Sequence, residues 1–272
     1  MPTVHPAVRF LRRRFSRGVP YGLGFTVAFG FVALALWGFV ELVEVVFEAE
    51  DLARLDAVAH RALYAAFGAS AALGRTVTWF GNHDTLVVGV VGVAGVLAGR
   101  RQYWAAFRVV FASGVGGLVV LGLKLLFSRE RPMEQVIEAT GYSFPSGHAF
   151  GSTVFYGMML YLTWRLTTDR RMRAAAAVVF PLVFLAVGLS RVYLNVHYLT
   201  DVVAGWLAGG AWLVASLLLV DVVETRTRSR IERREERARP EDAPPQPHPV
   251  PGAEEGGPEA PRHPERAWHG NP

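Results

Sequence analysis

The chain has 272 residues, of which 51% are hydrophobic and 19% charged, and its formal net charge is +5. That apolar content is high for a soluble domain and ordinary for a polytopic membrane protein. The chain contains no cysteine, which excludes disulfides, thiolate catalysis and metal sites built from cysteine. Its basic residues cluster beside apolar segments rather than on one amphipathic face, so the positive charge does not indicate nucleic-acid binding.

Six apolar segments are long enough to cross a bilayer, because a hydrocarbon core of about 30 Å needs about 20 helical residues. They are approximately 21–46, 77–98, 104–127, 148–166, 174–189 and 200–220. The first segment follows a run of arginines but is too long for the apolar region of a signal peptide, so we expect it to be retained. The sequence therefore predicts an all-α, polytopic membrane protein with six transmembrane helices.

The distribution of basic residues predicts the orientation of these spans. Nineteen arginines lie in residues 1–17, in the loops on the same side as the termini and between Arg226 and Arg239, against seven basic residues in the opposite loops. By the positive-inside rule, both termini are predicted to be cytoplasmic. Residues 1–20 then form a basic cytoplasmic segment and residues 21–221 a membrane domain. Residues 222–272 are rich in Arg, Glu and Pro and are predicted to form a disordered cytoplasmic tail.

Two further patterns concern packing rather than chemistry. Residues 48–67 have the periodicity of an amphipathic helix, which either lies in the outer membrane interface or only connects the first two spans. Glycines recur at spacings that let helix backbones approach closely in lipid. They are Gly92 with Gly95, the cluster Gly114, Gly116 and Gly117, and Gly205 with Gly209.

Three short polar stretches lie at loops between apolar segments, all on the predicted outer side. They are Lys124-x6-Arg131-Pro132, Pro145-Ser146-Gly147-His148 and Ser190-Arg191-x5-His197-x3-Asp201. Lys124 is the single lysine among 28 basic residues, and an ammonium is not interchangeable with a guanidinium. Lys124, Arg131 and Arg191 supply one point charge and two bidentate forks for the equatorial oxygens of a phosphoryl group. Ser146 and Gly147 precede a predicted helix N-terminus, which favours a bound anion.

The histidines of these stretches suggest an acid–base and nucleophile pair. His197 and Asp201 are four residues apart, which places them on one face of a helix. Asp201 can accept the Nδ1 proton of His197 and leave Nε2 as a nucleophile. His148 can protonate the leaving oxygen and then activate the water that resolves a phosphoenzyme. The alternative is a structural His–Asp pair, but ionisable groups at membrane depth are costly unless they are functional. The cation cluster neutralises the phosphate in this scheme, so we expect no metal or other cofactor.

Together the three stretches resemble the signature of the type 2 phosphatidic acid phosphatase (PAP2) family, K-x6-RP, PSGH and SR-x5-H-x3-D. The resemblance covers roughly residues 20–221 and includes every fixed position. It implies metal-independent hydrolysis of a lipid phosphomonoester or pyrophosphate, with His197 becoming phosphohistidine, Asp201 orienting it and His148 acting as general acid. It also implies that phosphate is bound by Lys124, Arg131, Ser146, Gly147 and Arg191. Soluble vanadium-dependent haloperoxidases share the signature, but six spans of lipid length argue against that function.

Three residues on the predicted outer side are weaker candidates for the substrate pocket. Asn82, within Gly81-Asn82-His83-Asp84, either touches the lipid headgroup or caps a helix, and the cap is the favoured interpretation. Tyr142 and Phe144 precede the second motif and either line the substrate entrance or pack within the loop.

The sequence leaves the substrate, the acceptor and the oligomeric state open. Candidate substrates are polyprenyl pyrophosphates such as undecaprenyl pyrophosphate, phosphatidylglycerol phosphate and phosphatidate. A lipid phosphotransferase would use the same phosphohistidine, and a non-catalytic protein that binds or translocates phospholipid would use the same anion site. The expected partners are this lipid substrate and the membrane lipids. The bias toward Arg, Ala, Val and Gly is typical of a GC-rich bacterial genome, which predicts a bacterial cell membrane location with an extracytoplasmic active site.

Overall fold

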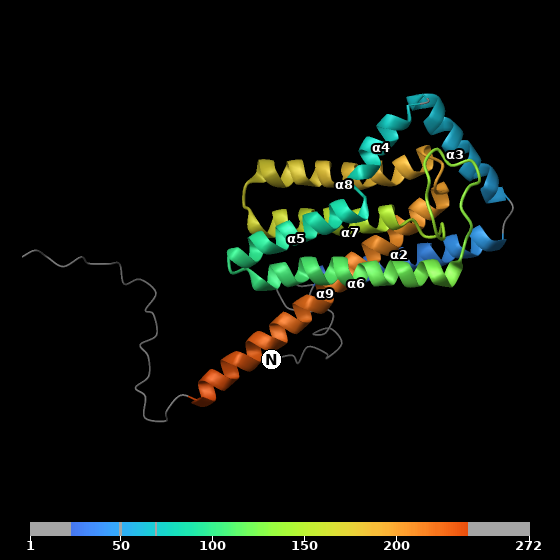
Figure 1. The fold of residues 1–272 in the computed structure, drawn as a ribbon. Coiled ribbons are helices and arrows are strands. Elements are labelled where there is room, and N and C mark those ends of the chain that lie inside the picture. Colours follow the sequence, from blue (N-terminus) through green and yellow to red (C-terminus); the bar gives the residue numbers. More distant parts are fainter. Residues whose placement is uncertain (1–22, 49–50, 69, 239–272) are drawn as a thin grey trace, which may run out of the picture. The chain divides into compact units, whose positions relative to one another are not determined.

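The computed structural model describes residues 23–48, 51–68 and 70–238. Over these ranges the chain forms helices and no strand, which confirms the predicted all-α class (Figure 1). The helices are α2 (Leu23–Glu48), α3 (Asp51–Phe67), α4 (Ala71–Trp79), α5 (His83–Gly99), α6 (Tyr103–Phe127), α7 (Gly147–Leu166), α8 (Arg170–Tyr193) and α9 (Leu199–Ala238). The predicted basic segment, residues 1–20, lies outside the described residues.

The chain divides into two compact units, residues 1–227 and 228–272. The disorder predicted from residue 222 is wrong as far as residue 238, because α9 continues to Ala238. The sequence contains neither glycine nor proline between Gly210 and Pro240, and its Arg and Glu residues have high helix propensity. Composition typical of a disordered tail is thus also compatible with a long polar helix. The rest of the predicted tail, residues 239–272, lies outside the described residues.

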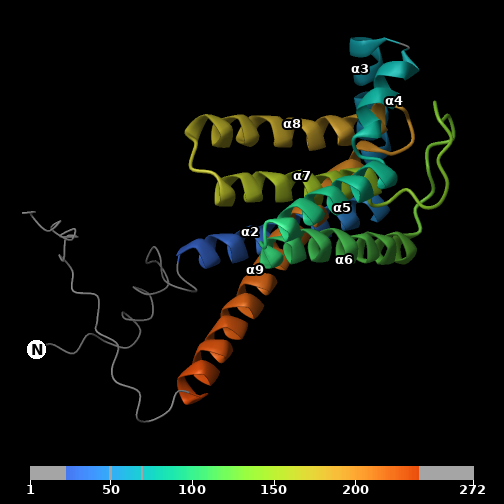
Figure 2. The ribbon, with the colours of Figure 1, turned by 60° about the vertical axis from the view of Figure 1, so that its left-hand side comes forward.

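Within the first unit, α7 lies among several other helices. It contacts α5, α6 and α8, and Figures 1 and 2 both show α6, α7 and α8 running side by side. The glycines of α9 lie against its first turns, since a Cβ on Gly205 would be 2.7 Å from the carbonyl oxygen of Ser146. A Cβ on Gly209 would be 2.9 Å from the carbonyl oxygen of Phe150. The main hydrophobic cluster joins α2, α6, α7 and α9 and includes Phe39, Val109, Met158 and Ala204.

The predicted packing role holds for only some of the glycines. It is confirmed for Gly205 and Gly209, and for Gly116, whose added Cβ would be 2.8 Å from the indole nitrogen of Trp212. It is wrong for four others, whose added Cβ atoms would have no neighbour within 4 Å in the described structure: Gly92, Gly95, Gly114 and Gly117. The spacing of glycines shows which side of a helix lacks bulky side chains, but it does not show which side another helix covers.

Five segments of the described chain are long and apolar enough to cross a membrane. They are Leu23–Phe47, Ala71–Gly99, Tyr103–Phe127, Arg170–Tyr193 and Leu199–Glu236, and they overlap five of the six predicted spans. The predicted span 148–166 forms α7, which is not among them. Neighbouring helices cover α7, and polar side chains such as Ser152 and Thr153 are buried along it. A helix enclosed by other helices does not need an outer surface as apolar as lipid.

The predicted second span, from residue 77, is wrong as a single helix. The turn Phe80–Asn82 separates α4 from α5. A Cβ on Gly81 would be 2.3 Å from the Cγ1 atom of Val187 in α8, so only glycine allows this turn to approach α8 so closely. The turn therefore brings the start of α5 to the same end of the molecule as the N-terminus of α7.

The predicted amphipathic helix forms α3, which is attached to the end of α8. The Nδ1 atom of His60 lies 2.9 Å from the carbonyl oxygen of Val192. Beyond α3, the carbonyl oxygen of Gly68 accepts a hydrogen bond of 2.7 Å from the hydroxyl of Tyr193. Tertiary contacts thus fix α3, and it does more than connect two spans.

We expect Gly205→Ala to destabilise the protein and Gly92→Ala to leave its stability unchanged or slightly raised. The added methyl group clashes with α7 at the first position and meets open space at the second, while helix propensity favours alanine over glycine at both by about 1 kcal/mol. Thermal unfolding in detergent, followed by circular dichroism, compares the two variants. Equal unfolding temperatures would contradict the close packing of α9 on α7.

Candidate active site

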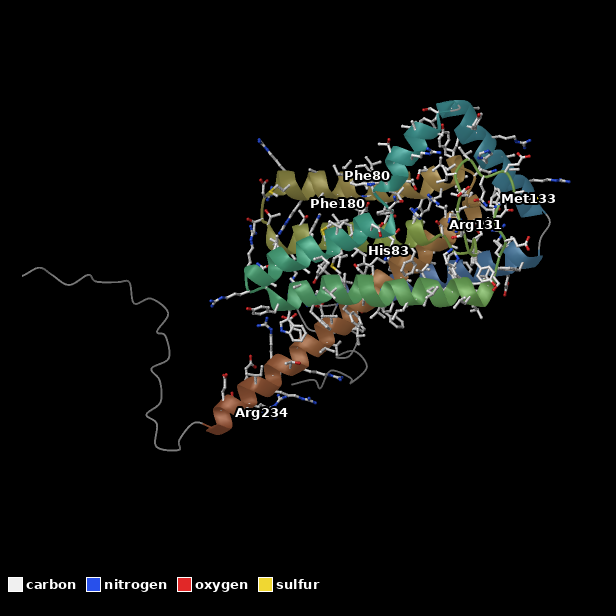
Figure 3. All side chains as sticks on the ribbon, in the orientation of Figure 1. Phe80, His83, Arg131, Met133, Phe180 and Arg234 are labelled. Atoms are coloured by element: carbon white, nitrogen blue, oxygen red, sulfur yellow. The ribbon has the colours of Figure 1, made fainter. Side chains whose placement is uncertain are left out.

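The three sequence motifs meet where the loop between α6 and α7 contacts the start of α9. The backbone N–H of Ser146 donates to the carbonyl oxygen of Asp201 at 2.9 Å, and a side-chain nitrogen of Arg131 donates to the carbonyl oxygen of Val196 at 2.7 Å. Figure 3, in which Arg131 is labelled, shows this side chain in the loop beyond one end of α6. The first unit therefore brings residues from three distant parts of the sequence into one cluster.

His197 and Asp201 form a buried pair at the beginning of α9. The Nδ1 atom of His197 lies 3.3 Å from the Oδ2 atom of Asp201, and the side chains are 2% and 0% exposed. The same Oδ2 atom accepts the backbone N–H of Tyr198 at 2.9 Å and a short hydrogen bond from the hydroxyl of Ser143. A buried carboxylate with this many donors stays ionised and keeps one orientation.

The contacts of His197 determine its tautomer. Its Nε2 atom lies 3.2 Å from the Nη1 atom of Arg131. A guanidinium only donates hydrogen bonds, so Nε2 is the acceptor and the ring proton is on Nδ1, toward Asp201. Burial lowers the pKa of His197 to about 4, against the opposing effect of the hydrogen bond and charge of Asp201. The ring is therefore neutral at pH 7, with a lone pair on Nε2.

Two cations beside His197 are held by backbone carbonyl groups instead of carboxylates. Lys124 donates to the carbonyl oxygen of Tyr142 at 2.6 Å. Arg131 donates to the carbonyl oxygens of Gly141 at 2.9 Å and Thr140 at 3.1 Å, and burial lowers its pKa. Neither cation forms a salt bridge with any described residue, so their charges are oriented but not neutralised. Such an arrangement suits an anionic ligand.

Arg191 supplies a third cation from the last turn of α8. One of its terminal nitrogens donates to the hydroxyl of Thr78 in α4 at 2.8 Å. Its Nε atom is buried and has no hydrogen-bond partner among the described residues. A buried, unsatisfied guanidinium nitrogen is costly, and an anion bound between Arg191 and the other two cations would satisfy it.

Ser146 and Gly147 form the N-terminus of α7. Ser146 is the N-cap residue, is 0% exposed, and its side chain accepts from the backbone N–H of Ala149 at 3.5 Å. A Cβ on Gly147 would lie 3.6 Å from the Cε atom of Lys124, so the lysine side chain crosses directly over this turn. The unpaired amides and dipole of the helix N-terminus add to the positive potential there.

His148 contacts Asn82 across the site. Its Nε2 atom lies 3.0 Å from the Oδ1 atom of Asn82, so the ring carries a proton on Nε2 when it donates this bond. Asn82 occupies the N-cap position of α5, as favoured from the sequence, but its side chain makes no capping hydrogen bond. The side chain reaches His148 instead, because the turn at Gly81 lies so close to α7 and α8 that Gly81 itself approaches the His148 ring.

The other two weak candidates occupy different environments. The side chain of Tyr142 is exposed, while its carbonyl oxygen holds Lys124. Phe144 is 0% exposed and packs against three aromatic rings, those of Phe39, Phe47 and Phe127. Phe144 therefore belongs to loop packing, the second of the two interpretations, and it anchors the loop that precedes the second motif.

Motif spacing did not identify three residues that contact the site: Asp56, Thr78 and Arg129. Arg129 donates to the Oδ1 atom of Asp201 at 2.6 Å and lies 3.3 Å from Asp56. A signal was present for Asp56, because this carboxylate interrupts the apolar face of α3 between Leu55 and Ala59. Thr78 lies in an ordinary apolar segment, and nothing in its sequence context marks it.

The geometry agrees with comparisons to known proteins. Residues 105–224 match the PAP2 superfamily. Phosphatidylglycerophosphatase B of Bacillus subtilis (strain 168) is 27% identical over 135 residues, which cover 49% of this chain and 66% of that relative. The crystal structure of a transmembrane PAP2-type phosphatidylglycerolphosphate phosphatase from Bacillus subtilis superposes with a TM-score of 0.63 at 22% identity. That superposition covers 72% of this chain and 96% of the other, and it shows a shared fold.

We expect the His197 ring to stay neutral, with its proton on Nδ1, from pH 7 down to about pH 4. An ordinary histidine titrates near 6.5, so between these values the unfolded chain binds a proton that the folded chain does not, and stability falls as the pH falls. Nitrogen-15 NMR of histidine-labelled protein measures the tautomer, and His197→Gln identifies the signal. A ring that protonates near pH 6.5, or that carries its proton on Nε2, would contradict this geometry.

Proposed function

We propose that this chain, whose residues 105–224 match the PAP2 superfamily, hydrolyses the phosphate of a membrane lipid phosphate or pyrophosphate through a phosphohistidine on His197. The observation that carries the proposal is the oriented imidazole, with Asp201 behind it and three cations around it, none of them in a salt bridge within the described structure. A protein that only bound phospholipid would need the cations but not a histidine with a directed lone pair.

The first step is attack on phosphorus by the Nε2 lone pair of His197. The bond from phosphorus to the leaving oxygen breaks, and this oxygen takes a proton from His148, whose protonated form is favoured by the negative charge of the bound phosphate. Lys124, Arg131 and Arg191 stabilise the charge on the equatorial oxygens. Arg131, which donates to Nε2 in the free site, turns its hydrogen bond to a phosphoryl oxygen and so uncovers the nucleophile.

The second step regenerates both histidines. His148, now neutral, removes a proton from water, and the water oxygen attacks the phosphorus. The bond between nitrogen and phosphorus breaks, its electron pair returns to Nε2, and inorganic phosphate leaves. Asp201 stabilises the proton on Nδ1 in both steps, as the carboxylate of an oriented-imidazole triad does. Cations of the protein neutralise the phosphate throughout, so the scheme requires no metal ion.

We further propose that α7 is the sixth transmembrane helix and that the site faces away from the cytoplasm. The 20 residues of α7 span about 30 Å, the thickness of the hydrocarbon core. The excess of arginine on the side of the termini supports cytoplasmic ends. Bacterial relatives and an arginine-rich composition support a bacterial cell membrane as the location.

We expect the purified protein to release phosphate in the presence of EDTA, and His197→Ala to release none. Polyprenyl pyrophosphate, phosphatidylglycerol phosphate and phosphatidate are compared in detergent, and the relative's name makes phosphatidylglycerol phosphate the first to test. Asp201→Asn should lower kcat about 10³- to 10⁴-fold, by analogy with oriented-imidazole triads. His148→Ala should accumulate radiolabelled phosphoenzyme from substrate labelled in the transferred phosphate.

Three results would count against this mechanism. Turnover by His197→Ala would exclude a covalent intermediate on that residue. Loss of activity in EDTA that magnesium restores would exclude the metal-free scheme. Transfer of phosphate to an added lipid alcohol, without release into water, would identify a phosphotransferase instead.

The orientation is tested by cysteine labelling, because the chain has no cysteine of its own. Met133 is fully exposed in the loop between α6 and α7 (labelled in Figure 3), and Thr168 is exposed in the loop between α7 and α8. In intact cells, a membrane-impermeant maleimide should label Met133→Cys and leave Thr168→Cys unlabelled until the membrane is opened. The reverse pattern would place the site in the cytoplasm.

A further inference from the structure

We propose that Arg129, held by the buried Asp56 of α3, is a positioning residue that fixes the Asp201 carboxylate behind His197. The effect on kcat rests on the proposed function, whereas the effect on the tautomer of His197 can be measured separately. Neither Arg129 nor Asp56 occupies a fixed position of the three motifs. Through this pair, α3 takes part in positioning the reacting groups. From the sequence, α3 could equally have been a helix that only connects the first two spans.

The guanidinium of Arg129 is bonded to other side chains of the protein. One terminal nitrogen donates to the Oδ1 atom of Asp201 at 2.6 Å and to the hydroxyl of Thr200 at 2.8 Å. The other lies 3.3 Å from the Oδ2 atom of Asp56. The guanidinium also lies over the ring of Tyr198, 4.1 Å from its centre. Two carboxylates and an aromatic face thus hold Arg129, whereas Arg131 is held by carbonyl groups and touches the nucleophile.

Asp56 fixes the arginine to the start of α9. Its side chain is buried, and its Oδ1 atom accepts the backbone N–H of Thr200 at 3.0 Å. Its Oδ2 atom accepts the hydroxyl of the same residue at 2.9 Å. A carboxylate at the first turn of a helix satisfies an unpaired amide and interacts favourably with the helix dipole. Asp56 therefore binds α9 and Arg129 at once, and α3 is held in place by the contact of His60 with α8.

The consequence for the reaction follows from how the two oxygens of Asp201 are used. Arg129 occupies Oδ1, which leaves Oδ2 for His197, Tyr198 and Ser143. Without Arg129, a buried carboxylate oxygen would lose its charged partner. The carboxylate would then rotate or take up a proton, and His197 would lose the acceptor that holds its proton on Nδ1.

A cavity of about 310 Å³ beside Arg129 offers the competing explanation and a control. Asp56, Arg61, Arg129 and Tyr198 are among the residues that line it. An anion bound there would make Arg129 a ligand-binding residue rather than a positioning one. Arg61 lines the same cavity, is exposed, and contributes the same charge without contacting Asp201, so Arg61→Gln is the matched control for Arg129→Gln.

The kinetic test compares these two variants in the phosphate-release assay. Arg129→Gln should lower kcat about 10- to 100-fold, by analogy with the outer-shell partners that orient metal-ligating side chains, and leave KM nearly unchanged. Arg61→Gln should change neither value. The double variant Arg129→Gln/Asp201→Asn should be no slower than Asp201→Asn alone, because both changes act through one carboxylate. Arg129→Lys, which keeps the charge but lacks the fork, should fall between wild type and Arg129→Gln, and it decides the question if Arg129→Gln does not fold.

The tautomer of His197, read by nitrogen-15 NMR, provides a test that does not depend on turnover. Arg129→Gln should reduce the population with the proton on Nδ1, Asp56→Asn should reduce it less, and Arg61→Gln should leave it as in wild type. A raised KM with unchanged kcat would overturn the inference and identify Arg129 as a ligand-binding residue. An unchanged tautomer with wild-type kcat would also overturn it. A wild type without turnover would refute the proposed function, and the NMR result would still decide the inference.

Discussion

The buried carboxylate of Asp201 is the interaction on which the site depends. Its two oxygens accept from His197, Ser143, Tyr198 and Arg129, which belong to the loop after α6 and to the segment that joins α8 to α9. A carboxylate enclosed in protein is unfavourable unless each lone pair has a donor. The need to satisfy one charge therefore draws two distant loops together, and the imidazole becomes oriented as a result.

The cations of the site fall into two groups, one whose charge the protein neutralises and one whose charge it leaves. Arg129 faces carboxylates, and its charge is neutralised within the protein. Lys124 and Arg131 face backbone carbonyl oxygens, which orient a cation without cancelling its charge. Arg191 has one hydroxyl partner and one unsatisfied nitrogen within the described structure. Positive charge that the protein holds but does not neutralise is what binding and transfer of a phosphoryl group require.

The sequence predicted the helical class, five of the six spans and the meeting of the three motifs, because long apolar periodicity and fixed motif spacing are local signals. It could not predict that the second span is two helices, since the break depends on how closely Gly81 approaches Val187 in another helix. It also did not distinguish α7 from the other predicted spans, although neighbouring helices enclose α7. Arg129 was missed because its role depends on partners that are 72 and 73 residues away.

Two arginines hold α9 at opposite ends of its membrane-spanning part. Arg108 of α6 pairs with Asp221 and Glu224, and Arg129, just beyond the end of α6, pairs with Asp201. At 1.5 Å per residue, the helical distance from Asp201 to Asp221 is about 30 Å, which is also the thickness of the hydrocarbon core. Each ion pair can then lie near one membrane interface, where charge is less costly than at the centre. Between them α9 packs on α7 through Gly205 and Gly209. Apolar contacts along the span and ionic contacts at its ends thus fix the position of α9, and the carboxylate that pairs with Arg129, that of Asp201, is also the partner of His197.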